Sequence, residues 1–339
     1  MGRVAASLAA VLAALAPLAC GDGDGAEPDA PQGATLVLDF QPNAVHAPLY
    51  AAEASDYFAD EGVNLAIREP SSAADGAKLL QAGRADLAIM DINDLGIARA
   101  RGLGLVAVAA LVQRPLAAVI SADPEAIRAP EDLEGASVGV TGVPSDDAVL
   151  DTVLESGSVP PGSVDRVTIG FAAVPALAAG RVDAATAFWN AEGVELRQEG
   201  VATREFRVDE LGAPRYPELV VVTRGNRAPA EPETVCPVIE ALARAYADLN
   251  RDPNAAIDAM LSELDGLDPA SQRAQFAELV AGSAFSAEVD GPADPVLTPA
   301  SVRGWADWAA ERGVIPASIT GGEIGGAFAP DQIRDCATG

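Results

Sequence analysis

Apolar and polar positions follow two different periods along the first part of the chain. Short runs rich in Val, Ile, Leu and Ala, typical of strands, are separated by longer helical stretches bounded by Gly, Pro or Asp. In this first block the pattern predicts strands over residues 34–40, 63–68, 85–90 and 105–111, and helices over 47–59, 72–82 and 94–101. Such alternation predicts a mainly parallel sheet with helices on both faces.

A second block repeats the alternation, and a helical tail follows it. The second block has predicted strands over 137–140, 166–169, 184–188 and 203–208, and predicted helices over 146–155, 174–179 and 192–198. Two further predicted strands, 115–121 and 219–223, flank this block and are the natural crossovers. The tail has predicted helices over 237–250, 253–264, 270–280 and 301–312. The chain is therefore predicted to be an α/β protein built from two such blocks.

Two crossings of the chain would connect these blocks as two lobes. If the helical tail packs back on the first block, lobe one comprises residues 34–118 plus 222–339, and lobe two comprises 119–221. Ligands of open α/β sheets sit beyond the carboxyl ends of the strands. Two lobes that face each other in this way would form a cleft that closes by a hinge.

The first residues indicate export. Residues 1–19 combine Arg3, an apolar run too short to span a bilayer and small residues before Cys20, which is typical of a signal peptide. The position of Cys20 resembles that of the acylated cysteine of bacterial lipoproteins, although Pro17 stands where an aliphatic residue is usual. Ordinary secretion is the alternative. Residues 20–33, rich in Gly, Asp, Pro and Ala, would be a flexible tether. We expect a cell-surface or periplasmic protein, anchored by lipid.

Charge and composition exclude several classes of function. The 339 residues include 22 Lys and Arg, 50 Asp and Glu and one His, for a formal net charge of −28. This balance argues against nucleic acid as a partner, because nucleic acid selects a basic face. A single His excludes metal sites built from several imidazoles, and we expect no metal and no cofactor. Aromatic residues make up only 4%, so places where they gather are informative.

The cysteines also agree with export. If Cys20 carries the lipid, Cys236 and Cys336 remain as an even pair. Because exported proteins meet an oxidising compartment, we expect these two to form a disulfide. Two free buried thiols are the alternative.

Five segments resemble the SsuA/THI5-like family. They are residues 38–50 (LDFQPNAVHAPLY), 57–63 (YFADEGV), 79–88 (LLQAGRADLA), 180–184 (GRVDA) and 188–193 (FWNAEG). Most members of that family are substrate-binding proteins of ABC importers for thiamine pyrimidine precursors, flavins or sulfonates. The resemblance implies a type II periplasmic-binding-protein fold, a small heteroaromatic ligand, ABC permease subunits as membrane partners and a monomeric protein. The segment 188–193 looks like the ligand-contacting segment of the pyrimidine-binding members.

Candidate ligand residues of the first lobe follow its predicted strands. Phe40, Asn43 and His46 lie between a strand and a helix. Asn43 offers both a donor and an acceptor, which suits a ring with mixed edges, and neutral His46 has the same capacity. The alternative is that Asn43 caps the next helix and His46 lies in its first turn. Asp91 directly follows another strand and is the acidic candidate.

Candidate residues of the second lobe lie in two loops. Ser145 opens a helix beside two aspartates, which would repel an anion. Phe188 and Trp189 are adjacent aromatics, and Glu192 comes one helical turn after Trp189. An indole face and a carboxylate suit an aminopyrimidine, which stacks and donates from its amine. A core Trp beside a solvated Glu is the alternative.

An enzymatic function is the alternative of another class. The resemblance extends to a pyrimidine synthase of the same fold, which uses a Lys, a His and a Cys-rich segment. Here Met90 and Asp94 stand at the positions of the Lys and the His, and no Cys cluster is present. We therefore expect a binding protein, with a thiamine pyrimidine precursor ahead of a flavin, and a sulfonate third.

Overall fold

The computed structural model describes residues 31–72, 75–142, 144–225, 232–317 and 336. The predicted signal peptide (1–19), Cys20 and the tether up to residue 30 lie outside these described residues. The predicted tether extends too far, because strand β1 (Gln32–Val37) already begins at Gln32. Across the described ranges, none of the helices combines the length and apolar character that crossing a membrane requires.

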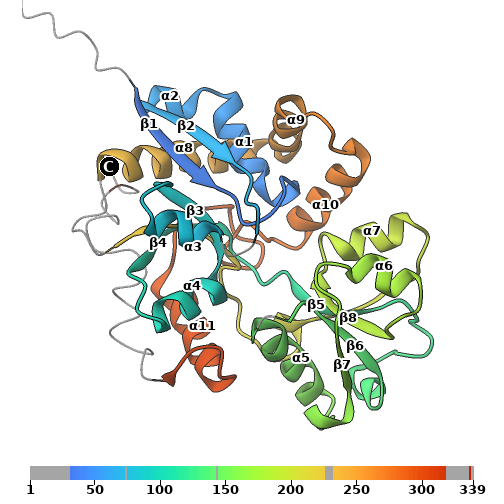
Figure 1. Ribbon diagram of the computed structural model, residues 1–339. Helices are drawn as coiled ribbons and strands as arrows, with labels where there is room; N and C mark the ends of the chain where they lie inside the picture. Colours follow the sequence, from blue (N-terminus) through green and yellow to red (C-terminus); the bar gives the residue numbers. More distant parts are fainter. Residues whose placement is uncertain (1–30, 73–74, 143, 226–231, 318–335, 337–339) are drawn as a thin grey trace, which may run out of the picture. The chain divides into compact units, whose positions relative to one another are not determined.

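The first sheet has the strand order β2-β1-β3-β10-β4 (Figure 1). Its strands are β1, β2 (Val63–Arg68), β3 (Leu87–Asp91), β4 (Leu105–Val112) and β10 (Leu219–Arg224). Strand β1 is parallel to β2 and β3, whereas β10 is antiparallel to β3 and β4. The sheet is therefore mixed, since β10 returns from the second block and inserts against the direction of its neighbours.

The second sheet has the order β7-β6-β8-β5-β9. Its strands are β5 (Ala117–Ser121), β6 (Ser137–Val140), β7 (Asp165–Thr168), β8 (Ala184–Phe188) and β9 (Arg204–Arg207). Strand β6 is parallel to β7 and β8, and the incoming strand β5 is antiparallel to β8 and β9. Each sheet thus keeps a parallel part and receives one crossing strand, where the sequence pattern alone predicted a mainly parallel sheet.

Both crossings come slightly earlier than the sequence pattern predicted. All of β5 belongs to the second sheet and all of β10 to the first, so the lobe boundaries at residues 118 and 221 fall inside strands. The first crossing is residues 113–116, and the second follows a short 3-10 turn, η4 (Val208–Glu210). Periodicity locates a strand but does not say which sheet it joins.

Helices cover the faces of both sheets. In the first block they are η1 (Ala44–His46), α1 (Ala47–Ala54), α2 (Tyr57–Asp60), α3 (Asp75–Gln81) and α4 (Ile92–Ala100). In the second block they are η2 (Pro130–Leu133), α5 (Pro144–Ser156), η3 (Pro161–Ser163), α6 (Ala173–Ala178) and α7 (Glu192–Gln198). The tail contributes α8 (Pro232–Arg251), α9 (Pro253–Glu263), α10 (Pro269–Ala281) and α11 (Pro299–Glu311).

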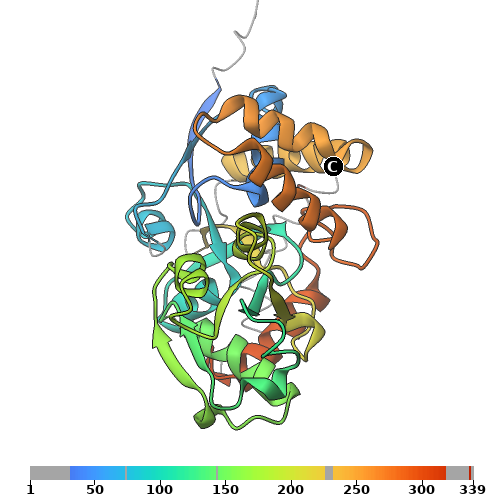
Figure 2. The same ribbon diagram turned by 90° about the vertical axis from the view of Figure 1, so that its right-hand side faces the viewer.

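The helical tail packs on the first sheet but not on it alone. Helices α8 and α9 lie beside α1, as the blue and orange segments show in both views (Figures 1 and 2). Helix α10 contacts η1 on one side and α7 of the second block on the other. In α11, Trp308 donates to the Thr152 hydroxyl of α5 at 3.2 Å. The tail therefore links elements of both blocks, which the sequence pattern did not predict.

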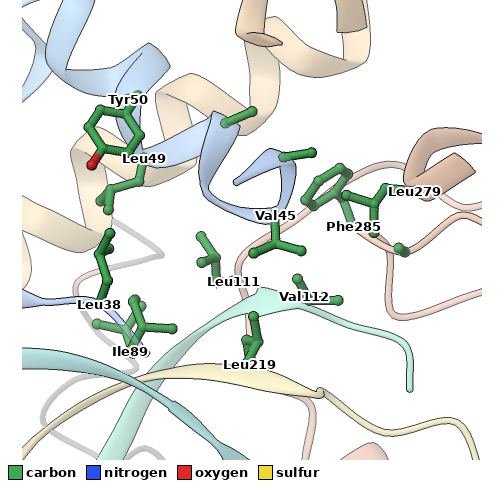
Figure 3. Packing of buried hydrophobic residues seen from close by; sticks show 14 of the residues in the cluster. Leu38, Val45, Leu49, Tyr50, Ile89, Leu111, Val112, Leu219, Leu279 and Phe285 are labelled. Carbon is green, nitrogen blue, oxygen red and sulfur yellow. The ribbon is translucent and has the colours of Figure 1, made fainter. Parts of the chain in front are cut away.

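The core around β1, β3 and β4 is formed by strands buried on both faces. Every residue of β4 is buried, as expected for a continuous apolar strand between two helical layers. Figure 3 shows Leu38 and Ile89 on the strand side, with Leu49 and Tyr50 of α1 above them. This packing fixes the carboxyl ends of the strands, from which the candidate site is built.

A disulfide joins the C-terminal end of the chain to the beginning of α8. The structure bonds Cys236 to Cys336, with their Cα atoms 5.1 Å apart. The Cys336 side chain is buried and packs against the first core cluster. The bridge closes a loop with a sequence separation of 100 residues.

Candidate functional site

A cavity of about 440 Å³ lies where the carboxyl ends of β1, β3, β6, β7 and β8 meet. Helix α10 completes its lining with Gln272 and Gln275. This is the position at which open α/β sheets bind ligands, and the volume is in the range of small-molecule sites. We take this cavity as the candidate ligand site.

Six of the eight predicted ligand residues line this cavity. They are Phe40, Asn43, Asp91, Ser145, Phe188 and Glu192. His46 and Trp189 do not line it, and both are completely buried elsewhere. The structure therefore brings six of the eight candidates together at one cavity and places the other two outside its lining.

His46 supports the cavity wall from behind. Its Nδ1 accepts a hydrogen bond from the Asn43 backbone N–H at 3.1 Å, and its Nε2 donates to Asp39 Oδ1 at 2.8 Å. Asn43 meanwhile caps η1, since its Oδ1 accepts from the Val45 N–H at 3.1 Å. The prediction of ligand contact for His46 is wrong, because both ring nitrogens are already bonded within the protein. Its role is to position Asp39 and Asn43, which do line the cavity.

Trp189 packs on the side of β8 opposite to the cavity. Its backbone N–H pairs with the Leu116 carbonyl at 3.0 Å and continues the ladder between β8 and β5. Its indole Nε1 donates to the Pro115 carbonyl at 3.0 Å, and the Arg207 guanidinium lies 4.2 Å from the ring centroid. The predicted stacking of Trp189 on a ligand is wrong. Side chains of an extended segment alternate between its two faces, so Phe188 faces the cavity and Trp189 faces away.

Three amide side chains of the cavity wall have buried polar atoms without a partner. Asn190 is completely buried, and neither its Nδ2 nor its Oδ1 is hydrogen-bonded. Gln272 and Gln275 are 8% and 7% exposed, and the Oε1 atom of each is unpartnered. Leaving a buried polar atom unsatisfied costs on the order of 1–3 kcal/mol, so such atoms are expected to bind something else. All three residues line the cavity.

The lining is strongly acidic. None of the described lining residues is Lys, Arg or His. Six of them are carboxylates, namely Asp39, Asp91, Asp94, Asp146, Glu192 and Glu195. Burial raises the pKa of Glu192, and burial followed by the charge of Asp146 raises the pKa of Asp94. Within the described ranges, no group of three His, Cys, Asp or Glu residues is placed to hold a metal ion.

Asp91, half-buried in the cavity lining, forms an acidic pair with Glu218, which is buried outside the lining. Asp91 caps α4 by accepting from the Asn93 N–H at 2.6 Å, and Glu218 Oε2 accepts from the Leu116 N–H at 2.7 Å. Burial, with the charge of Glu218 second, raises the pKa of Asp91. Burial likewise raises the pKa of Glu218 to about 7. Glu218 thus lies on one crossing of the chain and binds the other.

This pair leads to a prediction about pH. The pKa of Glu218 is about 7 in the folded protein and near 4.5 in the unfolded chain. At pH values between these two, the folded protein therefore keeps a proton that the unfolded chain has lost. Stability is therefore lost as pH rises through that window. We expect Glu218→Gln to be more stable relative to wild type at about pH 8 than at about pH 5. The difference in the free energy of unfolding between variant and wild type, measured in urea titrations, should be on the order of 2 kcal/mol larger at the higher pH.

The matched control for this prediction is Glu199→Gln, which removes an exposed carboxylate just after α7. Its effect on stability should be small at both pH values. A difference between Glu218→Gln and wild type that does not depend on pH would contradict the retention of a proton by the pair of Asp91 and Glu218.

Two aromatic rings from different sheets meet at the cavity. Phe40 follows β1 and Phe171 follows β7, and their ring centroids are 5.7 Å apart. They are 44% and 73% exposed, and both line the cavity. Phe171 was missed in the sequence, although an aromatic residue just after a strand in an aromatic-poor chain is a usable signal.

Comparisons with known proteins agree with this arrangement. A family model described as NMT1/THI5 like matches residues 43–256, which is more than half of the chain. The chain belongs to this family. The resemblance seen in the sequence is thereby confirmed. The matched region begins at Asn43, near the end of the loop after β1, and contains the loops after β3, β6, β7 and β8.

Two relatives show the functional range of the family. A protein of Halalkalibacterium halodurans named formylaminopyrimidine-binding protein is 29% identical over 75% of this chain and 78% of its own length. A protein of Legionella pneumophila named 4-amino-5-hydroxymethyl-2-methylpyrimidine phosphate synthase is 25% identical over 52% of this chain and 56% of its own length. The family thus includes proteins named for binding and for synthesis of pyrimidines.

The fold is that of type II periplasmic binding proteins. The alkanesulfonate-binding protein SsuA of Xanthomonas axonopodis pv. citri superposes with a TM-score of 0.67 at 19% identity. The superposition covers 89% of this chain and 99% of that one. This likeness confirms the predicted α/β fold class, with two mixed sheets in place of mainly parallel ones.

Proposed function

We propose that this protein is the substrate-binding component of an ABC importer and captures a small aminopyrimidine, a precursor of the thiamine pyrimidine, for delivery to a membrane permease. The observation that carries the proposal is Asn190, a buried amide in the cavity wall with both polar atoms unpartnered. The relative named for binding a formylaminopyrimidine supports the same ligand class.

The side-chain amide of Asn190 matches one edge of an aminopyrimidine. That edge carries a ring nitrogen that accepts and an adjacent exocyclic amine that donates. An Asn amide can bind both, as it does with the comparable edge of adenine. Phe40 and Phe188 supply apolar faces for the ring, and Glu192 lies beside them as a further acceptor for the amine.

The proposal predicts a strong effect of Asn190→Leu. A bidentate pair of this kind contributes about 1–3 kcal/mol, so the variant should bind an aminopyrimidine about 10- to 100-fold more weakly in calorimetric titrations. The variant should remain folded, because Leu keeps the number and branching of the side-chain heavy atoms and removes an unpartnered polar group from the interior.

The control for this experiment is Asn64→Leu, which alters an exposed residue of β2 outside the cavity lining. Its affinity should equal that of wild type. Unchanged affinity in Asn190→Leu would show that Asn190 does not read the ligand and would remove the main support for the proposal.

The other ligand classes fit the cavity less well. A sulfonate is an anion and would be repelled here, because the charged groups of the described lining are all carboxylates. A flavin remains the second candidate within the binding class, because its ring edge also combines donors and acceptors. A screen of melting temperatures against pyrimidines, flavins and sulfonates separates these classes.

Synthesis of a pyrimidine is the alternative of another class, and we propose that this chain does not catalyse it. Met90 and Asp94 line the cavity at the positions where the resembling synthase would carry its Lys and His. Met90 provides no amine for a Schiff base. Formation of a pyrimidine product on incubation with iron and pyridoxal phosphate would contradict this view.

We further propose export with a lipid anchor. Residues 1–19 would be removed as a signal peptide, Cys20 acylated, and the protein held monomeric at the cell surface or in the periplasm by its tether. Intact-mass analysis of the native protein tests this, because acylation adds the mass of the lipid to a chain that begins at Cys20.

A further inference from the structure

The cavity has more acceptors than a neutral aminopyrimidine can use. Asn190 alone matches the ring edge, which leaves the Oε1 atoms of Gln272 and Gln275 buried and unpartnered on the part of the wall formed by α10. The two glutamines are three residues apart, so they lie on one face of that helix. Gln275 is further fixed by its Nε2, which donates to the Ser271 hydroxyl at 3.3 Å.

These acceptors lie in a strongly negative environment. Helix α10 packs against α7, and the α7 residues Glu192 and Glu195 line the same cavity. None of the described lining residues is basic, so no protein cation offsets these carboxylates within the lining. A buried charge is costly unless it is paired, and a ligand that brings the missing positive charge would pair several of them at once.

A protonated primary amine would complement the unpartnered acceptors and the carboxylates of this wall. It carries one positive charge and three N–H donors and has no acceptor. Two amide oxygens and one carboxylate would satisfy its three donors. A formylated amine, in contrast, is neutral and brings no positive charge for the carboxylates of this wall.

On these grounds we propose that the site takes its pyrimidine as a cation, with a protonated primary amine held by Gln272, Gln275 and the acidic face of α7. This inference rests on the proposed function and adds to it a preference for an aminomethyl substituent over a formylated one. It therefore sets this protein apart from the relative whose name refers to a formylaminopyrimidine.

Matched ligands test the inference. We would titrate 4-aminopyrimidines that differ only in the substituent on the neighbouring ring carbon, which is aminomethyl, formamidomethyl, hydroxymethyl or methyl. We expect the aminomethyl compound to bind about tenfold or more tightly than each of the others. Its affinity should also fall as NaCl rises from about 20 to about 500 mM, while the affinities of the neutral ligands stay constant.

Variants identify the residues responsible. Gln272→Met and Gln275→Met keep the side-chain length but remove the acceptor, so each should weaken the aminomethyl ligand by about tenfold and the methyl ligand by less than about twofold. Gln198→Met, at an exposed position of α7 outside the lining, should change neither affinity. Unchanged melting temperatures would exclude a loss of folding as the cause.

The outcomes separate this inference from the proposed function. If the formamidomethyl or hydroxymethyl compound binds as tightly as the aminomethyl one, the preference for a cation is refuted while aminopyrimidine binding stands. If affinity for the aminomethyl ligand is the same in the glutamine variants, the assigned residues are wrong. If none of the four pyrimidines binds, the proposed function fails and the inference fails with it.

Discussion

Replacing Trp189 by alanine is expected to lower the free energy of unfolding by about 3–5 kcal/mol, the usual loss for a large aromatic residue removed from a core. The indole is completely buried, donates to the Pro115 carbonyl and lies under the guanidinium groups of Arg207 and Arg114. Gly282 packs so closely against it that a Cβ atom there would lie 2.9 Å from Cη2 of the indole. Urea denaturation measures the loss directly.

Ligand affinity decides what the loss means. Because Trp189 does not line the cavity, the folded fraction of Trp189→Ala should bind the ligand with nearly the wild-type dissociation constant. Trp189→Phe is the matched control, since it keeps an aromatic ring beside Arg207 and removes the donor to Pro115, and its loss of stability should be smaller. If Trp189→Ala kept full stability and lost ligand affinity, Trp189 would be a ligand-contacting residue and its assignment to the core would be wrong.

Removal of the disulfide is expected to lower the free energy of unfolding by about 2–4 kcal/mol. The bridge between Cys236 and Cys336 closes a loop with a sequence separation of 100 residues, and a long loop restricts the unfolded chain strongly. The double variant Cys236→Ser and Cys336→Ser should therefore unfold at a lower urea concentration than wild type. Neither residue lines the cavity, so ligand affinity should not change.

Alkylation of the native protein provides an independent check of the bridge. Neither Cys236 nor Cys336 should react with iodoacetamide before reduction, and both should react after reduction and unfolding. Two reactive thiols in the unreduced protein, or equal denaturation midpoints for wild type and the double variant, would contradict the disulfide and its contribution.

The order of elements was predictable because strand and helix periods differ. The loops after β1, β3, β6 and β8 were also predictable as site loops, since the carboxyl ends of the strands follow from the element order. Which of two neighbours faces the cavity was misjudged at Phe188 and Trp189. Successive side chains of an extended segment point to opposite faces, so the orientation of Phe188 and Trp189 can be assigned only after one of the two is known to face the cavity.

Other features depend on contacts between distant segments. Gln272 and Gln275 come from the helical tail, and no local pattern states that α10 reaches the cavity between η1 and α7. Asn190 lay within the recognised segment, yet only its unpartnered buried amide distinguishes it from its neighbours. Likewise, the direction of β10 depends on the sheet that it enters, which its apolar sequence does not specify.

The single histidine of the chain gives the protein an intrinsic spectroscopic reporter. Its ring is shielded from solvent and bonds to Asp39 and to the backbone of Asn43, which are both part of the cavity wall. An NMR spectrum of the imidazole nitrogens therefore contains one pair of signals and needs no assignment. Because the ring lies behind the wall and outside the lining, those signals can register the arrival of a ligand without the label itself touching it.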